Sequence, residues 1–428
     1  MEALKYNCMI EKNINIVNLG CRLNIYEGEV IKSLTKQNNL SNYTIINSCS
    51  VTEKAEKKVR YEIRKSKKNF PKKKIIVTGC AAQINPAKYA QIDEVDFVIG
   101  NKEKLQKETW SSLSKNNPIQ VKDIFIDNKM HNNIVEKFEG KSRAYIEIQQ
   151  GCDHRCTFCI IPFGRGNNRS VPVGIIVKRI QTLVKNNYNE VVLTGVDITD
   201  YGQDLPGKPN LFQLIKRILN LIPNLKQLRL SSIDCAEINE DFWPLLNEKR
   251  LMPHFHLSLQ SGNNLILKRM KRRHNRQQVI DFCRKVRYLR KDVVFGADII
   301  AGFPTETNKM FQDSLNIIKE CNLTHLHIFP YSIRKNTPAA RMPQVPKDII
   351  KIRAKILREE GDKQKQRFLH GQIGKSATML VEQVKKNISY GKTQHFTKIK
   401  INDSIKAGEI VKCTITDINN DILSACII

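Results

Sequence analysis

The sequence predicts an α/β protein with a small N-terminal parallel α/β domain, a partial (β/α)6 barrel and a small C-terminal β-barrel. Through most of the chain, apolar strand-like runs alternate with amphipathic helical stretches, as they do in parallel sheets. A polar stretch divides these runs into two series. The last section changes to short alternating runs broken by Gly, Asn and Asp, which is typical of a small β-barrel. We therefore expect domains at 1–125, 138–368 and 371–428.

The first domain is predicted from short apolar runs separated by amphipathic stretches. The strand candidates are Ile14–Cys21, Tyr43–Cys49, Lys74–Cys80 and Asp96–Gly100. Helical patterns occupy Asn24–Lys36 and Glu53–Lys68 between them, so a parallel sheet is expected. The stretch Ser114–Lys141 is polar with few strong patterns, and we expect it to be a linker.

The second series contains six strand-like runs separated by helical patterns. The strand candidates are Tyr145–Cys152, Glu190–Ile198, Gln227–Asp234, His254–Gly262, Val293–Gly302 and His325–Ser332. The helix candidates include Val173–Asn186, Leu211–Leu221, Arg276–Leu289 and Lys309–Cys321. Six βα units predict an incomplete barrel, with its chemistry at the carboxyl ends of the strands. A long basic helix, Lys347–Phe368, should follow, and then the β-barrel at Gly371–Ile428.

Composition restricts the class of protein and its partners. Lys and Arg number 71 against 42 Asp and Glu, a formal charge of +29, which attracts polyanions such as nucleic acid. Lysine-rich composition can also reflect genome base composition, so charge alone leaves both interpretations open. No apolar run reaches the roughly 20 residues that span a bilayer, and the first residues do not resemble a secretory signal. We expect a cytoplasmic protein with no membrane partner.

Three of the 12 cysteines form a C-x3-C-x2-C motif, Cys152, Cys156 and Cys159, after the first barrel strand. The cytosol keeps thiols reduced, so metal ligation is a better explanation than disulfides. Three thiolates on a 4Fe–4S cluster leave one iron open for a chelating ligand. The alternative is a zinc site that adds His154, although structural zinc sites usually use two separated pairs of ligands.

Another three cysteines, Cys21, Cys49 and Cys80, each end a predicted parallel strand of the first domain. The carboxyl ends of strands in an open α/β sheet border one crevice, so these thiols should converge on a second ligand site. The alternative is that they are three small buried side chains, because free cysteine is often buried.

At its cysteine motif the chain resembles the radical S-adenosylmethionine superfamily. The C-x3-C-x-aromatic-C pattern is met by Cys152, Cys156, Phe158 and Cys159. The resemblance implies that Phe158 lies against the adenine of S-adenosylmethionine. It also implies that Thr194, Gly195 and Val196, at the end of the second barrel strand, meet the methionine amino group. Weaker candidates at later strand ends, which could equally be packing or capping residues, are Ser231, Gln260 and Asp298.

Over nearly its full length the chain resembles the methylthiotransferase family. The matching segments are Asn18–Ile31 (NLGCRLNIYEGEVI), Ile46–Arg60 (INSCSVTEKAEKKVR), Val77–Pro86 (VTGCAAQINP), His256–His274, Gly296–Thr307 and His327–Pro346. The resemblance implies two 4Fe–4S clusters, the second on Cys21, Cys49 and Cys80, two molecules of S-adenosylmethionine, and a C-terminal TRAM-type RNA-binding barrel. No single catalytic residue is predicted.

Members of that family differ in substrate. Leu19–Glu27 and Thr337–Pro346 resemble the enzymes that methylthiolate C2 of N6-threonylcarbamoyladenosine at tRNA position 37, whereas Ser332–Asn336 departs from the expected Pro- and Gly-rich form. The alternatives are isopentenyladenosine in tRNA and an aspartate of a ribosomal protein. An alternative of another class is a non-catalytic metal-binding RNA-binding protein. An adenine C2–H is neither acidic nor a leaving group, so replacing it with sulfur needs a carbon radical rather than acid–base catalysis.

The resemblance also implies partners: tRNA, and a low-potential electron donor such as a flavodoxin or ferredoxin. We expect a monomer. Basic residues near the predicted active face could pair with phosphate or with the carboxylate of S-adenosylmethionine, or could form an ordinary solvated face. The candidates for RNA contact are Arg165, Arg169, Lys268, Arg269, Lys271, Arg272 and Arg273.

Overall fold

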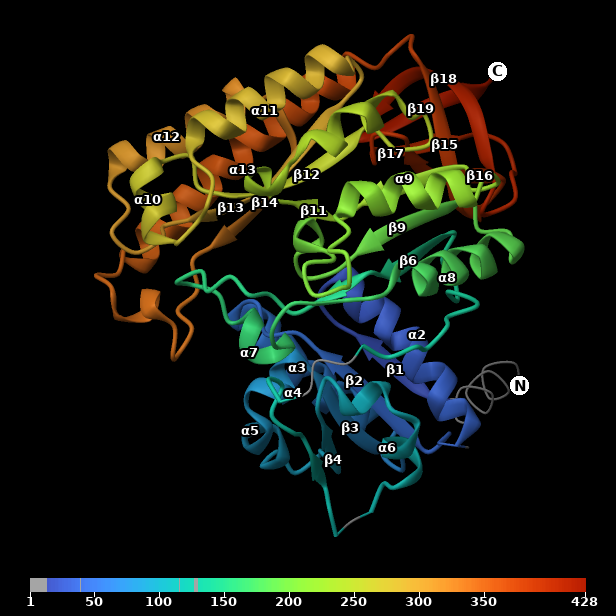
Figure 1. Ribbon diagram of the computed structural model, residues 1–428, viewed down its shortest axis with the longest axis vertical. Coiled ribbons are helices and arrows are strands. Elements are labelled where there is room, and N and C mark those ends of the chain that lie inside the picture. The colour runs from blue at the N-terminus through green and yellow to red at the C-terminus, as the bar shows by residue number, and fades with distance from the viewer. Residues whose placement is uncertain (1–13, 39, 115, 127–129) are drawn as a thin grey trace.

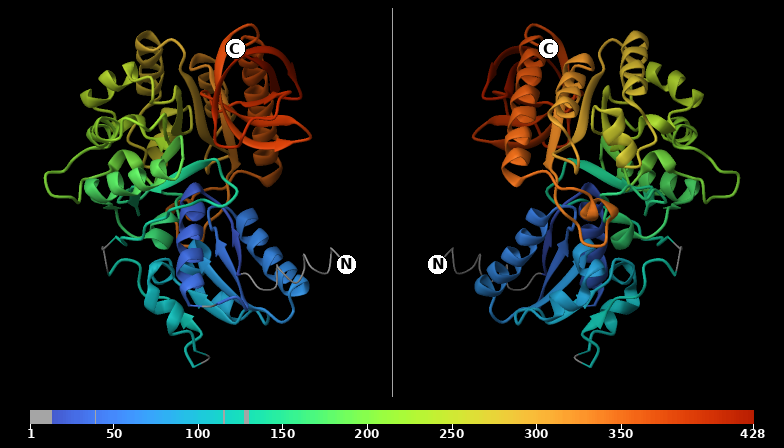
Figure 2. Two further views of the ribbon diagram at one scale, coloured as in Figure 1. Left: turned by 90° about the vertical axis from the view of Figure 1, so that its right-hand side faces the viewer. Right: turned by 90° about the vertical axis from the view of Figure 1, so that its left-hand side faces the viewer.

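The computed structural model describes residues 14–38, 40–114, 116–126 and 130–428. An N-terminal α/β unit lies against an open barrel of strands and helices, and a small β-barrel packs beside the open barrel (Figures 1 and 2). This arrangement confirms the predicted α/β fold class. Within the described part of the chain, no helix combines the length and apolar character needed to cross a lipid bilayer.

The N-terminal unit is built on one five-stranded sheet. Its strands, all parallel and in chain order, are β1 (Asn15–Asn18), β2 (Tyr43–Ser48), β3 (Lys74–Gly79), β4 (Phe97–Ile99) and β5 (Ile119–Gln120). The helices are α2 (Arg22–Gln37), α3 (Glu53–Asn69), α4 (Cys80–Ile84), α5 (Pro86–Ala90) and α6 (Lys107–Ser111). After their first residues, β2 and β3 are buried throughout, which explains their continuous apolar runs.

One prediction for this region is wrong. Strand β5 lies inside the stretch Ser114–Lys141 that was expected to be a linker, of which 115 and 127–129 fall outside the described residues. It pairs with β4 through short backbone bonds, such as Gly100 N to Gln120 O at 2.9 Å. A two-residue strand has no detectable periodicity, so the sequence gives no signal for it.

The middle unit is an open barrel of six parallel strands that follow chain order. The strands are β6 (Arg143–Glu147), β9 (Glu190–Thr194), β10 (Gln227–Leu230) continued as β11 (Ser232–Ile233), β12 (His254–Gln260), β13 (Val294–Ala301) and β14 (Leu323–Pro330). The third strand is interrupted at Ser231. A short antiparallel pair, β7 (Gln149–Gln150) and β8 (Arg169–Ser170), brackets the cysteine loop.

Helices follow the strands of the open barrel; most cover its outside, and the short first helix instead packs on α4 of the N-terminal unit. They are α7 (Ile161–Arg165), α8 (Val173–Lys185), α9 (Leu211–Leu221), α10 (Asn264–Arg269), α11 (Arg276–Leu289), α12 (Asn308–Glu320) and α13 (Lys347–His370). Asn210 and Asn275 begin α9 and α11 with capping boxes, each contributing about 1 kcal/mol. The third βα unit differs from the expected pattern, because its helix is a 3₁₀ helix, Glu240–Asn247, with Pro244 inside it.

The C-terminal unit is a closed five-stranded barrel, as predicted. Its strands are β15 (Ser376–Lys385), β16 (Ile388–Thr393), β17 (Lys398–Ile401), β18 (Ile410–Asn419) and β19 (Ile422–Ile427), in the order β15-β16-β17-β19-β18. Alternate residues of each strand point inward and form a small apolar core of their own.

This C-terminal barrel docks on the amino ends of the open-barrel strands around one aromatic side chain, with further contacts such as Asn189 Nδ2 donating to Gly408 O at 2.8 Å. Phe396, at φ +64° in the turn between β16 and β17, stacks on His254 with ring centroids 5.6 Å apart. The guanidinium groups of Arg143 and Arg229 lie 5.1 and 5.2 Å from its ring centroid. Arg229 also donates to the carbonyl of Gln394 at 2.8 Å. Cation–π contacts and hydrogen bonds therefore close this end of the open barrel.

Candidate active site

An opening lined by polar and apolar side chains lies at the other end, where the carboxyl ends of the strands face the N-terminal unit. It is a cavity of about 290 Å³. Val51 and Thr52, which precede α3, form part of its wall, so two units of the fold build it together. All three thiols of the motif Cys152, Cys156 and Cys159 line this cavity.

The loop that carries these thiols depends on a glycine. Gly151 has φ +70°, and a Cβ there would lie 1.8 Å from the carbonyl oxygen of Asn167. Only glycine permits this close turn between β7 and the loop. Cys152 N then donates to Gly166 O at 3.1 Å, and Cys159 N donates to Cys156 O at 3.0 Å. These bonds fix the loop so that its three side chains share one space.

The chemistry of the thiols fits an iron–sulfur cluster. All three are free. Burial raises the pKa of Cys152, and it raises the pKa of Cys159 to about 12, so neither would be a thiolate at neutral pH without a metal. Arg272 Nη1 donates toward Cys156 Sγ at 3.7 Å, which would favour a negatively charged ligand sulfur.

His154, the fourth ligand of the zinc alternative, has other partners. Its Nε2 lies 3.3 Å from Asp197 Oδ2 and 3.2 Å from Glu237 Oε1. Hydrogen bonds to Asp197 and Glu237 raise the pKa of His154 to about 10, so in the metal-free protein the ring is a cation paired with these two carboxylates. This geometry favours the three-thiol site over a zinc site.

Four of the predicted S-adenosylmethionine contacts line the same cavity, namely Phe158, Val196, Gln260 and Asp298. The edge of the Phe158 ring packs on Phe303 with centroids 6.3 Å apart. Gln149 Oε1 accepts from Val196 N at 2.9 Å, which holds the strand end open toward the cavity.

The other three candidates lie behind the cavity wall. Thr194 is buried at the last position of β9. Gly195 packs so closely that a Cβ would lie 2.7 Å from Gln149 O. Ser231 is also buried, and its hydroxyl has no hydrogen-bond partner among the described residues. These three assignments stay predictions.

Sequence reasoning missed the partners of Asp298. Asp298 Oδ1 lies 2.9 Å from His256 Nε2 and 3.1 Å from His327 Nδ1. Burial opposes ionisation, but the hydrogen bonds from the two histidines outweigh it and lower the pKa of Asp298 well below its usual value. The cavity therefore contains a fixed negative charge. The available signal was the pair of H-x-H repeats in β12 and β14, which place these histidines on one face.

The second cysteine set converges as the strand-end argument predicts. Cys21 and Cys80 follow β1 and β3, and Cys49 follows β2. Gly20 has φ +96°, and a Cβ there would lie 2.8 Å from Cys49 Sγ, so the first strand end touches the second. Burial raises the pKa of Cys49 to about 11, and the nearby Cys80 and Cys21 add to the rise. Three free thiols in mutual electrostatic contact fit a second cluster site.

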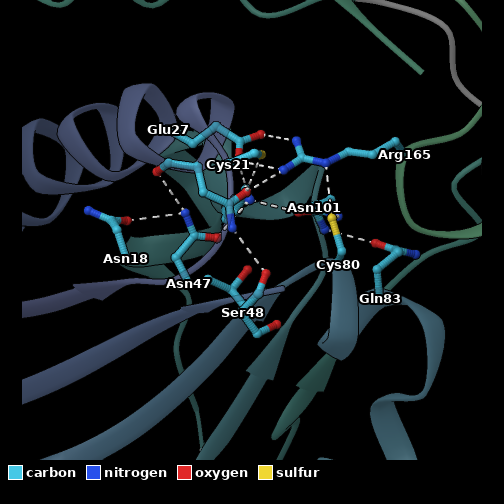
Figure 3. A network of polar contacts seen from close by, with 12 residues as sticks. Asn18, Cys21, Glu27, Asn47, Ser48, Cys80, Gln83, Asn101 and Arg165 are labelled. Atoms are coloured by element: carbon cyan, nitrogen blue, oxygen red, sulfur yellow. Dashed lines mark hydrogen bonds and ion pairs between the residues drawn. The ribbon is translucent and has the colours of Figure 1, made fainter. Parts of the chain in front are cut away.

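The predicted RNA contacts separate into buried and exposed groups. Arg165 and Arg169 are 1% and 3% exposed, so the prediction that they contact RNA is wrong for this structure. Arg165 instead donates to groups of the N-terminal unit (Figure 3), and Arg169 donates to Arg165 O at 2.8 Å. Their position beside the cysteine loop suggested accessibility, but α4 packs on α7, which ends at Arg165, and Arg169 lies in the buried strand β8.

The remaining basic candidates lie on α10 or directly after it, and one of them reaches the cavity. Arg272 faces inward, lines the cavity and pairs with Asp234 at 2.6 Å. Arg269 donates to Thr305 Oγ1 at 2.7 Å. The exposed members of the set are Lys268, Lys271 and Arg273.

Two family profiles match the chain. The one described as the radical SAM superfamily covers residues 146–318, which contain the Cys152 motif and four of the six strands in full. The one described as uncharacterized protein family UPF0004 covers residues 13–100, which contain Cys21, Cys49 and Cys80.

Similar proteins cover the whole chain. The threonylcarbamoyladenosine tRNA methylthiotransferase MtaB of Rickettsia prowazekii is 50% identical over 99% of this chain and 100% of its own length. The tRNA-2-methylthio-N(6)-dimethylallyladenosine synthase of Rickettsia typhi is 31% identical, covering 95% and 97%. The structure of the radical S-adenosylmethionine methyltransferase TsrM from Kitasatospora setae has a TM-score of 0.55 at 14% identity and covers 77% of each chain. At that identity the last likeness concerns the fold alone.

Proposed function

The chain belongs to the threonylcarbamoyladenosine tRNA methylthiotransferases, a family of radical S-adenosylmethionine enzymes, and we propose that it transfers a methylthio group to C2 of threonylcarbamoyladenosine in tRNA. The observation that carries this proposal is the full-length identity of 50% to a relative with that name, against 31% to a relative named for dimethylallyladenosine. The cofactors of the superfamily are S-adenosylmethionine and a 4Fe–4S cluster.

Cys152, Cys156 and Cys159 would hold the cluster that binds S-adenosylmethionine. When bound, this cofactor pair supplies the one-electron cleavage that acid–base groups of the protein cannot supply. The residues of the chain bind and orient. Phe158 offers an aromatic face for the adenine, and the backbone at Val196 is held at the cavity by Gln149. Asp298 offers an ionised carboxylate, which suits the hydroxyl or ammonium groups of the cofactor.

Cys21, Cys49 and Cys80 would hold a second 4Fe–4S cluster, the site from which sulfur is delivered. Arg165, at the end of the first cluster loop, contacts Cys80. This contact supports two neighbouring cluster sites, because one side chain reaches from the first thiol set to the second. The first thiol set lines the cavity, and Val51 and Thr52, which closely follow Cys49, form part of its wall, so a substrate held there would lie between the two units with water excluded.

For tRNA, the exposed Lys268, Lys271 and Arg273 offer phosphate contacts beside the cavity, together with the C-terminal barrel. We further propose a low-potential donor such as a flavodoxin or ferredoxin, a monomeric state and a cytoplasmic location. The formal charge of +29 supports an RNA partner.

Nucleoside mass spectrometry of tRNA from cells lacking this protein tests the substrate. We expect 2-methylthio to disappear from threonylcarbamoyladenosine and to remain on isopentenyladenosine. Restoring the gene should restore the modification. The opposite loss would assign the chain to the isopentenyladenosine enzymes, and no loss in either nucleoside would contradict tRNA methylthiolation altogether.

A further inference from the structure

Arg165 joins the two cysteine sites. It is the last residue of α7, directly after the loop of Cys152, Cys156 and Cys159, yet its side chain extends into the N-terminal unit (Figure 3). Its Nε donates to Cys80 Sγ at 3.1 Å, a short distance for an N–H···S bond because sulfur is larger than oxygen. The guanidinium is 1% exposed, so solvent screens neither this bond nor its charge.

The guanidinium is fixed by partners other than the thiol. Nη1 and Nη2 both donate to the carboxylate of Glu27, and Nη2 donates to Asn24 Oδ1 at 2.6 Å. Both acceptors lie on α2, which begins directly after Cys21. The bidentate pair fixes the plane of the guanidinium, so the direction of its Nε–H is set before any ligand binds.

The charges of this network do not cancel. Glu27 also pairs with Lys104, whose Nζ lies 2.7 Å from Glu27 Oε2, and both side chains are fully buried. Although burial opposes it, Arg165 and Lys104 hold the pKa of Glu27 well below its usual range. Two cations therefore face one carboxylate. An excess positive charge remains beside the thiols, where three thiolates would carry negative charge.

A second side chain supports the same contact. Asn101 Nδ2 donates to Gly164 O at 2.5 Å and lies 3.7 Å from Cys80 Sγ. A Cβ on Gly164 would lie 3.2 Å from the Cβ of Cys80, so the backbone of α7 itself packs on this cysteine. The loop of one thiol set is thus in direct contact with a member of the other.

We propose that Arg165 is a positioning residue for the second cluster: it orients Cys80 as a ligand and raises the reduction potential of the cluster bound there. This inference rests on the proposed function, because it requires a cluster on Cys21, Cys49 and Cys80. Hydrogen bonds to ligand sulfur and nearby positive charge both stabilise the reduced, more negative state. A simple structural tie between units would stabilise the fold without changing the potential.

The test isolates the second cluster in the full chain by changing Cys152, Cys156 and Cys159 to Ala. In this background we compare Arg165, Arg165→Lys and Arg165→Gln by iron content and by potentiometric titration followed with electron paramagnetic resonance. Arg165→Gln should retain its cluster with a more negative midpoint potential. Arg165→Lys keeps the charge and loses the fixed N–H···S geometry, so its potential should lie between the other two.

Arg155→Gln is the matched control, because Arg155 is an exposed arginine of the same loop that contacts Cys152 O and Asn167. Its midpoint potential should equal that of the background protein. An unchanged potential in Arg165→Gln with full iron content would overturn the proposal. If Arg165→Gln loses its iron, Arg165→Lys decides: an intermediate potential supports the proposal, and an unshifted one shows that Arg165 is only a structural tie.

Failure of the proposed function would be visible earlier. If the background protein with Arg165 intact binds no iron and sulfide, Cys21, Cys49 and Cys80 hold no cluster, and the two-site mechanism fails with this inference. If the background protein binds a cluster whose midpoint potential does not change when Arg165 is substituted, only the inference fails.

Discussion

At the carboxyl ends of the open-barrel strands the chain leaves a cavity of about 290 Å³, whereas at their amino ends it inserts the ring of Phe396 from the neighbouring barrel. The open end contains free thiols and the ionised Asp298. At the closed end, burial lowers the pKa of His254 well below its usual value and that of His325 to about 3, so both rings are neutral.

This difference separates chemistry from stability along one set of strands. Parallel βα units place loops of variable sequence at the carboxyl ends, where ligands bind. The amino ends need only be sealed from water, and here an aromatic ring among arginines seals them. Changes at the open end should therefore remove activity from a folded protein, and changes at the closed end should reduce stability and leave the chemistry of the folded molecule intact.

The largest effect should come from the thiols of the open end. Changing Cys152, Cys156 and Cys159 to Ala should remove about half of the iron and abolish cleavage of S-adenosylmethionine. Changing Cys21, Cys49 and Cys80 to Ala should also remove about half of the iron, because each cluster contains four irons. That second variant should still make 5′-deoxyadenosine under reductant and form no methylthio product. Methylthiolation by it over several turnovers would show that these cysteines are ordinary core thiols.

Asp298→Asn should give the next largest effect. It removes the charge while keeping the shape, so binding of S-adenosylmethionine should weaken roughly 10- to 100-fold, as for the loss of a charge-assisted hydrogen bond. Equilibrium binding to the reconstituted protein measures this. The thermal midpoint should change little. Unchanged binding would show that Asp298 serves only its two histidine partners.

Removing one exposed charge from α10 should act on RNA alone. Lys268→Gln should weaken tRNA binding and reduce the slope of log affinity against log salt by about 1. Lys351→Gln, an exposed lysine on α13 away from the cavity wall, is the control and should leave the slope unchanged. Equal effects of the two substitutions would indicate that charge acts diffusely rather than at this edge.

At the closed end, Phe396→Ala should lower the free energy of unfolding by about 2 kcal/mol, below the value for a fully buried Phe because this ring is only half-buried. Denaturant titration measures it, and product formed per folded molecule should be unchanged. Tyr288→Ala, at a side chain 84% exposed, should stay within about 0.5 kcal/mol of the parent protein. A loss of turnover without loss of stability in Phe396→Ala would contradict the assignment of chemistry to the open end and stability to the closed end.

A further effect concerns pH. Burial lowers the pKa of His325 to about 3 and of His395 to about 4, against 6.5 when exposed, and His325 Nε2 lies 3.1 Å from His395 O. A depressed pKa gives stability that is complete above about pH 6.5 and is lost as pH falls toward 4 and 3. Thermal midpoints measured from pH 7.5 to 5 should fall, and His395→Gln should reduce the fall. An identical pH dependence in that variant would show that His395 does not contribute to the loss of stability at low pH.

Truncating the C-terminal barrel is a poor test of RNA binding, because this barrel also seals the closed end of the open barrel. Deletion would remove Phe396 and expose Arg143, Arg229 and His254 at once. A loss of tRNA affinity could then come from a loosened open barrel. Surface substitutions on the C-terminal barrel keep the seal and separate the two causes.

The sequence by itself determined the fold class, the C-x3-C-x2-C motif and the convergence of Cys21, Cys49 and Cys80. Strand runs, strand ends and motif spacing are local properties, and a parallel sheet brings its carboxyl ends to one edge whatever the details. Family resemblance then supplied the substrate and the chemistry. None of this required a contact between distant segments to be known.

Only the tertiary structure decided what distant polar side chains do. From the sequence alone, Arg165 would be expected to be an accessible arginine beside a cluster loop. In the structure it is buried beside α4 and donates to Cys80, 85 residues away in the sequence. Asp298 acquires its partners only when β12, β13 and β14 pair side by side, and Phe396 acquires its ring of arginines only after the C-terminal barrel docks. The physical reason is that burial and pairing of a charge depend on the packing of whole units, which hydrophobic periodicity does not encode.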